Sequence, residues 1–301
     1  MTSPGVGSIV VPASTTVLAP AKINLVLRIL DRRPDGYHNL WSLMQTVQLE
    51  DELSISLSGN HSTLNLQCDD PTLKTDPSNL VYRAAMAVLE RSERVVGLDM
   101  VLAKRIPMGA GLGGGSSDAA ATIIGLNQLL NLGWSKEQMA DVGQALGSDV
   151  PFFFLAPSAA VEGRGEKVIP VRITGSRRWV VLVNPGFPVE TKWAYQQLSR
   201  SRTGVQPLSD VHRTLGKASE LSWGDVLQAA ENDFETPVFK THPILRGIKQ
   251  KLLAAGAEAA LLSGSGATVF GVFYDEPTAR QAEIAFRIDP GFKVYTVPTS
   301  L

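Results

Sequence analysis

The stretch PMGAGLGGGSSDAAA, residues 107–121, is a glycine-rich segment followed directly by a helix-forming one. Five of the seven residues at positions 109–115 are glycine, and two serines, an aspartate and three alanines follow directly. A flexible linker would have no strong element after it, whereas alanine is the best helix former. Glycines let backbone N–H groups approach an anion, and a helix start adds unpaired N–H groups. The stretch therefore predicts a phosphate-binding loop that leads into a helix, with a structural glycine turn as the alternative.

Two well-known phosphate-binding loops do not fit this stretch. Gly109, Gly111 and Gly114 match the GxGxxG spacing of dinucleotide-binding folds, but those folds need a second strand after the helix. Here a second helix is predicted instead, because residues 135–138 (SKEQ) form a capping-box pattern. A Walker loop needs a lysine directly after its glycines, and the next lysine is Lys136. The loop is therefore expected to bind phosphate in another type of fold.

Strand and helix patterns are mixed along the chain without strict alternation. Strand-like runs lie at residues 21–29, 43–49, 51–57, 63–67, 98–106, 179–185 and 292–297, and two strands joined by a glycine turn are predicted at each of residues 160–171 and 259–273. Helical patterns lie at residues 76–92 (with Asp76 as N-cap), 118–130, 135–147, 242–257 and 276–286. Residues 199–219 lack a clear period and are predicted to be a mobile connection. The mixture favours an α+β fold, and we expect a domain boundary at residue 158.

The composition excludes several classes of protein. With 301 residues, of which 44% are hydrophobic and 19% charged, the chain has an ordinary globular composition. Its net charge of -1 does not favour nucleic acid as a partner. Cys68 is the only cysteine, so neither an internal disulfide nor a multi-cysteine zinc site can form. The N-terminus lacks a basic signal region and no apolar run approaches about 20 residues, so we expect a cytoplasmic protein without a membrane partner.

Three stretches together resemble a known superfamily. PAKINLVL (residues 20–27), the glycine-rich stretch, and LLSGSGATVFGVF (residues 261–273) are similar to the three motifs of the kinases grouped as galactokinase, homoserine kinase, mevalonate kinase and phosphomevalonate kinase. They occur in the expected order and span nearly the whole chain. The resemblance implies a two-domain α+β fold, with an N-terminal half like domain 2 of ribosomal protein S5 and a ferredoxin-like C-terminal half. Residues 1–158 would then bind ATP and residues 159–301 the substrate.

The same resemblance implies that ATP and Mg²⁺ bind at the glycine loop. The residues implied to contact ATP are Pro107, Met108, Gly109, Ala110, Gly111, Leu112, Gly113, Gly114, Gly115, Ser116 and Ser117. A serine hydroxyl there could reach a phosphate or the metal, and Ser117 is the candidate metal ligand. Mg²⁺ between the β- and γ-phosphates would offset the charge that develops during transfer.

Three further segments narrow the resemblance to one family. PDGYHNL (residues 34–40), SDVPFFF (148–154) and VNPGFPVETKWAY (183–195) are similar to segments of the 4-diphosphocytidyl-2-C-methyl-D-erythritol kinases of the non-mevalonate isoprenoid pathway. This implies ATP-dependent phosphorylation of the 2-hydroxyl of a cytidine diphosphate sugar alcohol. The alternative is another kinase of the superfamily, acting on homoserine or mevalonate. A catalytically inactive nucleotide-binding module and a dehydrogenase are the rivals from other classes.

The resemblance also assigns roles to individual side chains. Asp149 matches the catalytic aspartate and would accept or orient the proton of the attacking hydroxyl, while Lys22 would keep Asp149 ionised. The intact pair also argues against an inactive module. The residues implied to bind the acceptor substrate are Tyr37 and Tyr195 as stacking aromatics, His38 as the reader of cytosine, Asn24 for the methylerythritol hydroxyls, and Gly264 and Ser265 near the phosphates.

Each of these residues has a simpler interpretation as well. Seen alone, Lys22 would be a solvated strand residue, Asp149 a turn or cap residue, and Tyr37 part of an ordinary hairpin. His61, His212 and His242 have no sequence neighbours that suggest a metal site and are expected at the surface. The sequence leaves the oligomeric state, monomer or homodimer, open.

Overall fold

The structure is a computed structural model of the chain that describes residues 14–58, 63–202 and 204–301, so His61 lies outside the described residues. The strands within these ranges are β1 (Ser14–Arg32), β2 (His38–Ser58), β3 (Leu64–Cys68), β4 (Gly97–Ala103), β5 (Ser158–Gly163), β6 (Lys167–Pro170), β7 (Arg172–Thr174), β8 (Trp179–Asn184), β9 (Glu220–Ser222), β10 (Glu231–Asn232), β11 (Ala259–Leu262), β12 (Val269–Phe273) and β13 (Lys293–Pro298). The helices are α1 (Leu80–Ser92), α2 (Gly114–Leu129), α3 (Lys136–Gln144), α4 (Phe152–Leu155), α5 (Thr191–Ser201), α6 (Asp210–Leu215), α7 (Trp223–Gln228), α8 (Glu235–Thr241), α9 (Pro243–Ala254) and α10 (Glu276–Phe286). The α+β class expected from the sequence is confirmed.

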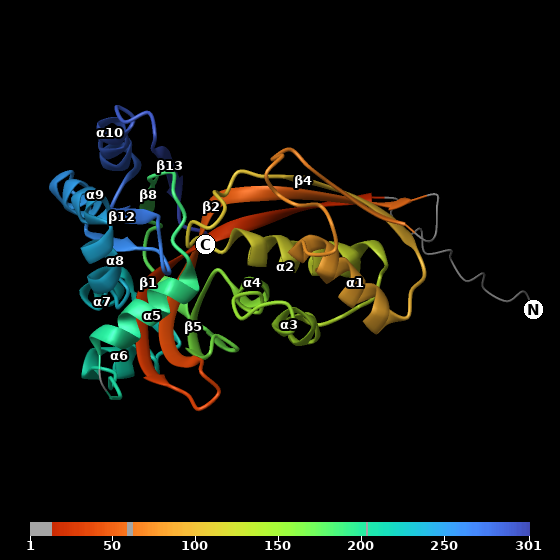
Figure 1. The fold of residues 1–301 in the computed structure, drawn as a ribbon, viewed down its shortest axis with the longest axis horizontal. Coiled ribbons are helices and arrows are strands. Elements are labelled where there is room, and N and C mark those ends of the chain that lie inside the picture. Colours follow the sequence, from red (N-terminus) through yellow and green to blue (C-terminus); the bar gives the residue numbers. More distant parts are fainter. Residues whose placement is uncertain (1–13, 59–62, 203) are drawn as a thin grey trace, which may run out of the picture.

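A long antiparallel hairpin of β1 and β2 runs along much of the molecule (Figure 1). The two strands have 19 and 21 residues, far more than the usual five or six. The predicted strands at 43–49 and 51–57 both lie in β2, so strand structure at these residues is confirmed and only the expected break between them was wrong. The register with β1 shifts between Pro20 and Ala21, opposite this region, and such a bulge interrupts the alternation that marks a strand in sequence.

The first sheet has the order β10-β1-β2-β4-β3, and off this path β5 pairs with β2 and β6 pairs with β5. One end of β2 pairs with β5 and the other with β4, so the hairpin links two regions of the fold. Helices α1 to α4 lie together on one side of it (Figure 1). Alanines at the start of α2 are fully buried, because small residues let the helix approach β1 and β2 closely. This packing fixes where α2 begins.

The second sheet has the antiparallel order β11-β12-β8-β13 and is covered on one face by α9 and α10. Alternate residues of β8 face opposite ways. Val181 and Val183 pack in a core with α9 and α10 residues, whereas Val180 and Leu182 pack in a core with β1 and β2 residues. The second sheet is thus sandwiched between its own helices and the long hairpin. The predicted boundary at residue 158 falls at the start of β5, and the division into two domains there stays a prediction.

Several local expectations need correction. The N-cap of α1 is Asn79 rather than Asp76, because the Asn79 side chain accepts from Val81 N, while Asp76 accepts from Ser78 N in a turn just before. Residues 199–219 are not a bare connection, since they include the end of α5 and all of α6. The capping box at Ser135 is confirmed. No helix within the described residues is long and apolar enough to cross a membrane.

One of the histidines differs from expectation. His212 is buried rather than at the surface, and its Nε2 lies 3.1 Å from the carbonyl oxygen of Ala229. His242 stands at the start of α9 and its ring lies against those of Phe187 and Trp193. His212 is therefore a core residue, whereas His242 is half-buried and keeps part of its surface in solvent.

Candidate active site

The glycine loop (residues 107–113) connects β4 to α2 and is held from two sides. On one side, the backbone N–H of Lys22 in β1 donates to the carbonyl of Leu112 at 2.9 Å. On the other, the hydroxyl of Ser263, after β11, donates to the carbonyl of Gly111, also at 2.9 Å. The loop is therefore clamped between the long hairpin and the β11–β12 turn, which brings all three sequence motifs together.

Glycine is required at two positions of the loop by close approach as well as by backbone conformation. Gly111 has φ +78°, and a Cβ there would lie 2.0 Å from the carbonyl oxygen of Ser263. Gly113 has φ +71°, and its Cβ would lie 2.9 Å from Cγ of Lys22. Gly113 is the N-cap of α2, and no described side chain caps it. The first N–H groups of α2 therefore remain available to an anion.

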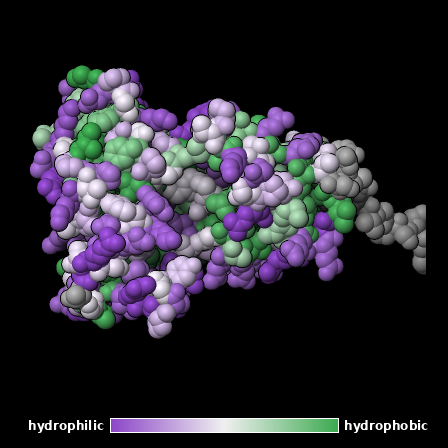
Figure 2. All heavy atoms as spheres, viewed as in Figure 1, coloured by the Kyte–Doolittle hydropathy of each residue, from purple (hydrophilic) through white to green (hydrophobic). Residues whose placement is uncertain are grey.

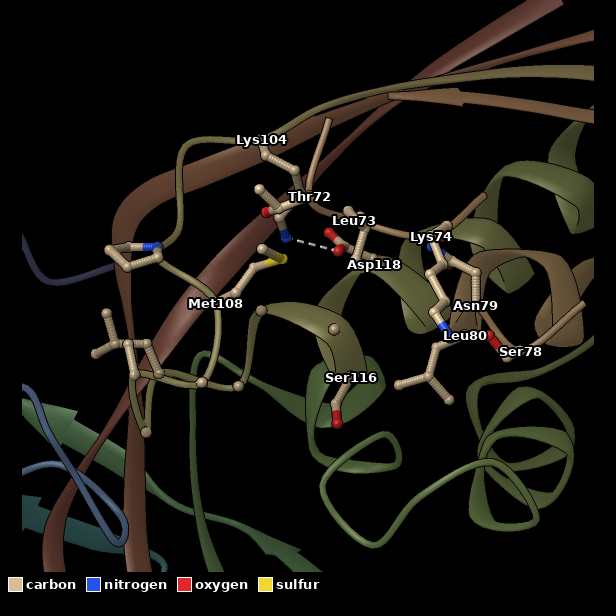
Figure 3. A pocket seen from close by; sticks show the side chains of 18 residues that line it. Thr72, Leu73, Lys74, Ser78, Asn79, Leu80, Lys104, Met108, Ser116 and Asp118 are labelled. Carbon is tan, nitrogen blue, oxygen red and sulfur yellow. Dashed lines mark hydrogen bonds and ion pairs between the residues drawn. The ribbon is translucent and has the colours of Figure 1, made fainter. Parts of the chain in front are cut away.

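A first cavity of about 550 Å³ opens over this loop (Figure 3). Its walls come from the loop, from the start of α1 and from the segment before it. The lining residues are Thr72, Leu73, Lys74, Ser78, Asn79, Leu80, Lys104, Asp118 and the whole of residues 107–116. The structure thus brings the predicted ATP-contacting residues together, apart from Ser117. Ser117 is buried and outside the lining, and its hydroxyl has no hydrogen-bond partner within the described residues.

A buried charge cluster forms one wall of this cavity, and the sequence did not reveal it. Lys104 Nζ lies 2.7 Å from Asp118 and also binds Asp51 (Figure 3 shows the contact with Asp118). Burial would lower the pKa of Lys104, but the two carboxylates raise it overall. Burial raises the pKa of Asp118 to about 7, helped by the charge of Asp51. One ammonium cannot fully stabilise two buried carboxylates, so Lys104 stays charged and Asp118 is the group that takes up a proton.

A second cavity of about 390 Å³ meets the first at the glycine loop, because Gly111, Gly113 and Ser116 line both. The predicted catalytic pair lies here, with Lys22 Nζ 3.6 Å from the Asp149 carboxylate. The remaining lining residues are Asn24, Leu27, Leu40, Met44, Gly147, Ser148, Arg164, Thr191, Tyr195, Phe234, Gly264 and Ser265. Figure 2 shows the hollow between the C-terminal half and the N-terminal helices, where pale residues of intermediate hydropathy meet. A group bound above the loop could be passed from one cavity to the other.

Lys22 is positioned by its neighbour on the same strand. Its Nζ donates to Asn24 Oδ1 at 2.7 Å, and Asn24 Nδ2 donates to the Ser42 hydroxyl at 2.9 Å. Lys22 and Asn24 are both nearly fully buried, whereas the Asp149 side chain is 31% exposed, at the cavity wall. The ammonium group is therefore fixed beneath a carboxylate that a substrate can reach.

The predicted base-reading residues are only partly brought together. The His38 ring stacks on that of Tyr195, with 4.9 Å between centroids, and His38 Nε2 lies 3.0 Å from the Ser199 hydroxyl. Tyr195 lies in α5, not on a strand, and lines the second cavity. Tyr37 is 56% exposed and lies outside the lining. Tyr37 and His38 thus flank the cavity beside Tyr195 without closing a sandwich.

The titration behaviour of these rings follows from their surroundings. Burial, followed by the charge of Arg32, lowers the pKa of His38, so the imidazole is neutral near pH 7. Burial and the charge of Asp149 raise the pKa of Tyr195, which keeps its hydroxyl protonated. Gly264 and Ser265 line the cavity as predicted, and the Ser265 hydroxyl lies 3.0 Å from that of Thr191.

A metal ion here would depend on the nucleotide for most of its ligands. No cluster of three or more histidine, cysteine, aspartate or glutamate side chains within the described residues is arranged to hold one. Mg²⁺ in kinases is held by one or two protein oxygens together with substrate phosphates, which this site can provide. The Ser117 hydroxyl at the start of α2 is an unpartnered oxygen, but it is buried and outside the cavity lining, and its assignment as a metal ligand stays a prediction.

Family models and named relatives match this chain. Residues 79–156 match the GHMP kinases N terminal domain, and residues 208–288 match the GHMP kinases C terminal family. A 4-diphosphocytidyl-2-C-methyl-D-erythritol kinase of Geobacter sp. (strain M21) is 44% identical over 88% of this chain and 92% of its own. The enzyme of the same name from Syntrophotalea carbinolica is 44% identical over 93% of this chain and 97% of its own.

Solved structures of kinases superpose on this chain over most of its length. A crystal structure of 4-(cytidine 5'-diphospho)-2C-methyl-D-erythritol kinase superposes with a TM-score of 0.78 and 32% identity, covering 95% of this chain and all of that one. Homoserine kinase from Cytophaga hutchinsonii superposes with a TM-score of 0.74 over 99% of this chain and 98% of its own, but is only 18% identical, which shows a shared fold. The two-domain small-molecule kinase fold is therefore confirmed. The chain belongs to the ATP-dependent GHMP kinases, in the family of the 4-diphosphocytidyl-2-C-methyl-D-erythritol kinases.

Proposed function

We propose that this kinase transfers the γ-phosphoryl group of ATP to the 2-hydroxyl of 4-diphosphocytidyl-2-C-methyl-D-erythritol, in non-mevalonate isoprenoid precursor biosynthesis. The observation that carries the proposal is the Lys22–Asp149 pair, 3.6 Å apart, where two cavities meet at the glycine loop. The relatives of more than 40% identity that carry this enzyme's name support the same substrate. A homoserine or mevalonate kinase remains the alternative, and it rests on likeness of fold.

The nucleotide end of the reaction uses the first cavity. ATP, with Mg²⁺, supplies the phosphoryl group and neutralises its charge. The glycine loop and the free N–H groups of α2 hold the phosphates, and Ser117 is the candidate for a direct metal ligand. The lining of this cavity comes entirely from residues 72–118, which supports an ATP-binding domain within residues 1–158.

The acceptor end uses the second cavity, where Asp149 orients the attacking hydroxyl and accepts its proton. Lys22 lies 3.6 Å from that carboxylate and stabilises charge on the hydroxyl oxygen, and Asn24 can contact a neighbouring hydroxyl. At the other end of the substrate, neutral His38 reads the cytosine while Tyr37 and Tyr195 provide aromatic faces. Because Lys22 and Tyr195 come from opposite sides of residue 158, acceptor binding draws on both proposed domains.

The test is ADP release with 4-diphosphocytidyl-2-C-methyl-D-erythritol, measured for the wild type, Lys22→Ala and Asp149→Ala. We expect activity in the wild type and a loss of about 100- to 10,000-fold in kcat for both variants. Asp210→Ala, which removes an exposed carboxylate from α6, is the matched control and should keep full activity. If the wild type releases no ADP with 4-diphosphocytidyl-2-C-methyl-D-erythritol but phosphorylates homoserine or mevalonate, the alternative function is the correct one. A cytoplasmic location stays a prediction.

A further inference from the structure

A tight turn between β5 and β6 places an arginine at the second cavity. Arg164 stands between two glycines with positive φ, +73° at Gly163 and +117° at Gly165. A Cβ at Gly163 would lie 2.7 Å from Glu166 Oε1, and one at Gly165 would lie 3.0 Å from Cβ of Ser148. The Glu166 carboxylate also accepts from the Arg164 backbone N–H. The backbone that carries Arg164 is therefore held in one conformation, against the segment that contains Asp149.

The Arg164 side chain connects two parts of the acceptor site. Its Cζ lies 3.9 Å from the centroid of the Tyr37 ring, a cation–π contact, and the residue also lines the cavity of Lys22 and Asp149. Among the described residues, no carboxylate forms an ion pair with its guanidinium. Lys22, the other cation of this cavity, is already engaged by Asn24 and Asp149. Of the two cations that line the acceptor cavity, Arg164 is therefore the one whose guanidinium is available to an anionic ligand.

The order of groups in the proposed substrate matches this placement. The polyol hydroxyl must reach Asp149, and the cytosine must reach Tyr37 and His38. The diphosphate that joins the two ends must then lie between these residues, which is where Arg164 reaches. Arginine presents a planar fork of N–H donors that binds phosphate oxygens in pairs, and it can do so while its face rests on an aromatic ring.

We propose that Arg164 determines substrate specificity by binding the diphosphate of the acceptor. This inference rests on the proposed function and adds to it a residue that selects nucleoside diphosphate derivatives over uncharged alcohols. The contact with Tyr37 holds the face of the guanidinium against the ring and leaves its N–H edge free for phosphate oxygens in the cavity.

The experiment compares cytidine and CDP as competitive inhibitors of the wild type, Arg164→Ala and Arg164→Lys. In Arg164→Ala we expect the KM for the acceptor and the inhibition constant of CDP to rise about 10- to 100-fold, because a charged hydrogen-bond pair is lost. The inhibition constant of cytidine, which has no phosphate, and the KM for ATP should change less than about 3-fold. Arg164→Lys keeps the positive charge but lacks the planar fork of N–H donors. Its acceptor KM and CDP inhibition constant should lie between those of the wild type and Arg164→Ala. Arg172→Ala, which removes an exposed arginine of β7, is the control.

Three results would overturn the inference while leaving the proposed function intact. They are an unchanged CDP inhibition constant in Arg164→Ala, equal weakening of CDP and cytidine, and a fall in kcat with unchanged acceptor KM. The second result would mean that Arg164 acts on the base through Tyr37, and the third that it acts on the transferred group. A wild type that neither phosphorylates the acceptor nor binds CDP would overturn the proposed function, and this inference with it.

Discussion

Asp118 belongs to the buried charge cluster around Lys104 and also lines the cavity over the glycine loop. One of its carboxylate oxygens binds Lys104, while Oδ1 is buried without a hydrogen-bond partner among the described residues. Because Asp51 binds the same ammonium group, the cluster has one negative charge too many for a buried site. The folded protein therefore favours the neutral form of Asp118, whose pKa rises from 3.8 to about 7.

Replacing Asp118 by asparagine should change the pH dependence of stability. A raised carboxyl pKa means that the folded state binds the proton more tightly, so stability is lost as pH rises from about 4 through 7. The amide in Asp118→Asn does not titrate, so the free energy of unfolding of this variant relative to wild type should grow by about 3 kcal/mol between pH 5 and 8. Urea unfolding at each pH measures this, with Asp210→Asn as an exposed control. A difference that stays constant with pH would refute the assignment of the proton to Asp118.

What the sequence predicted for single residues depended on motifs. Lys22 and Asp149 belong to recognisable motifs, and the structure brings them together although they lie far apart in the sequence. Arg164 and Lys104 went unnoticed, because an isolated cation has no neighbours in sequence that predict its use. The only local signal for Arg164 is its pair of flanking glycines, which indicates a turn but not what the turn faces.

Among the elements, the glycine loop is the most sensitive to a single added methyl group. In Gly111→Ala the Cβ would collide with the Ser263 carbonyl at 2.0 Å, so the loop must leave the β11–β12 turn. We expect a loss of several kcal/mol in unfolding free energy and at least about a 10-fold weaker affinity for ATP. Gly133→Ala is the matched control, because Gly133 also has positive φ (+68°) but no atom within 4 Å, and it should cost about 1 kcal/mol. Thermal unfolding and ATP titration provide the measurements, and equal effects of the two substitutions would contradict this account.

Element boundaries were predicted well where local chemistry sets them and poorly where tertiary contacts do. Helix α3 begins at its capping box, and α9 ends just before Gly256, whose φ is +94°, as its sequence indicated. Trp193 and Tyr195 are an example of the second kind, because they lie in α5, where their aromatic side chains pack toward α8 and the cavity. Their spacing of two suits a strand, and only the tertiary fold shows that α5 turns them differently.

For the molecule as a whole, the mixture of strand and helix patterns predicted the α+β class but not how the two halves share structure. Strand β10 joins the first sheet in parallel with β1, although the two strands lie in different halves of the chain. An isolated bridge likewise links Val47 of β2 to Thr299 near the C-terminus. The hydrophobic pattern of a sequence can identify a strand but not the strand with which it pairs, because any strand of suitable length could pair with the same sheet edge.

Asn232 in β10 ties these distant parts together, which makes it a test of how the halves cooperate. Its Nδ2 donates to the carbonyls of Leu262 and Gly264, at 2.7 and 2.8 Å, and thereby holds the β11–β12 turn beside β1. We expect Asn232→Ala to lower the free energy of unfolding by about 2–3 kcal/mol, because two buried carbonyls lose their partner. It should also lower kcat about 10-fold or more, since Gly264 lines the acceptor cavity and a small displacement there misplaces the substrate.

The control for this substitution is Asn127→Ala, within the N-terminal half. Asn127 makes a comparable pair of hydrogen bonds, to the backbone carbonyl and N–H of Trp134, away from both cavities. It should therefore destabilise the protein without changing kcat at a temperature where both variants remain folded. If the two substitutions lower kcat equally, activity follows global stability, and Asn232 has no separate role in positioning the turn. If only Asn232→Ala is slow, the contact between β10, which pairs with β1, and the β11–β12 turn positions that turn at the catalytic centre.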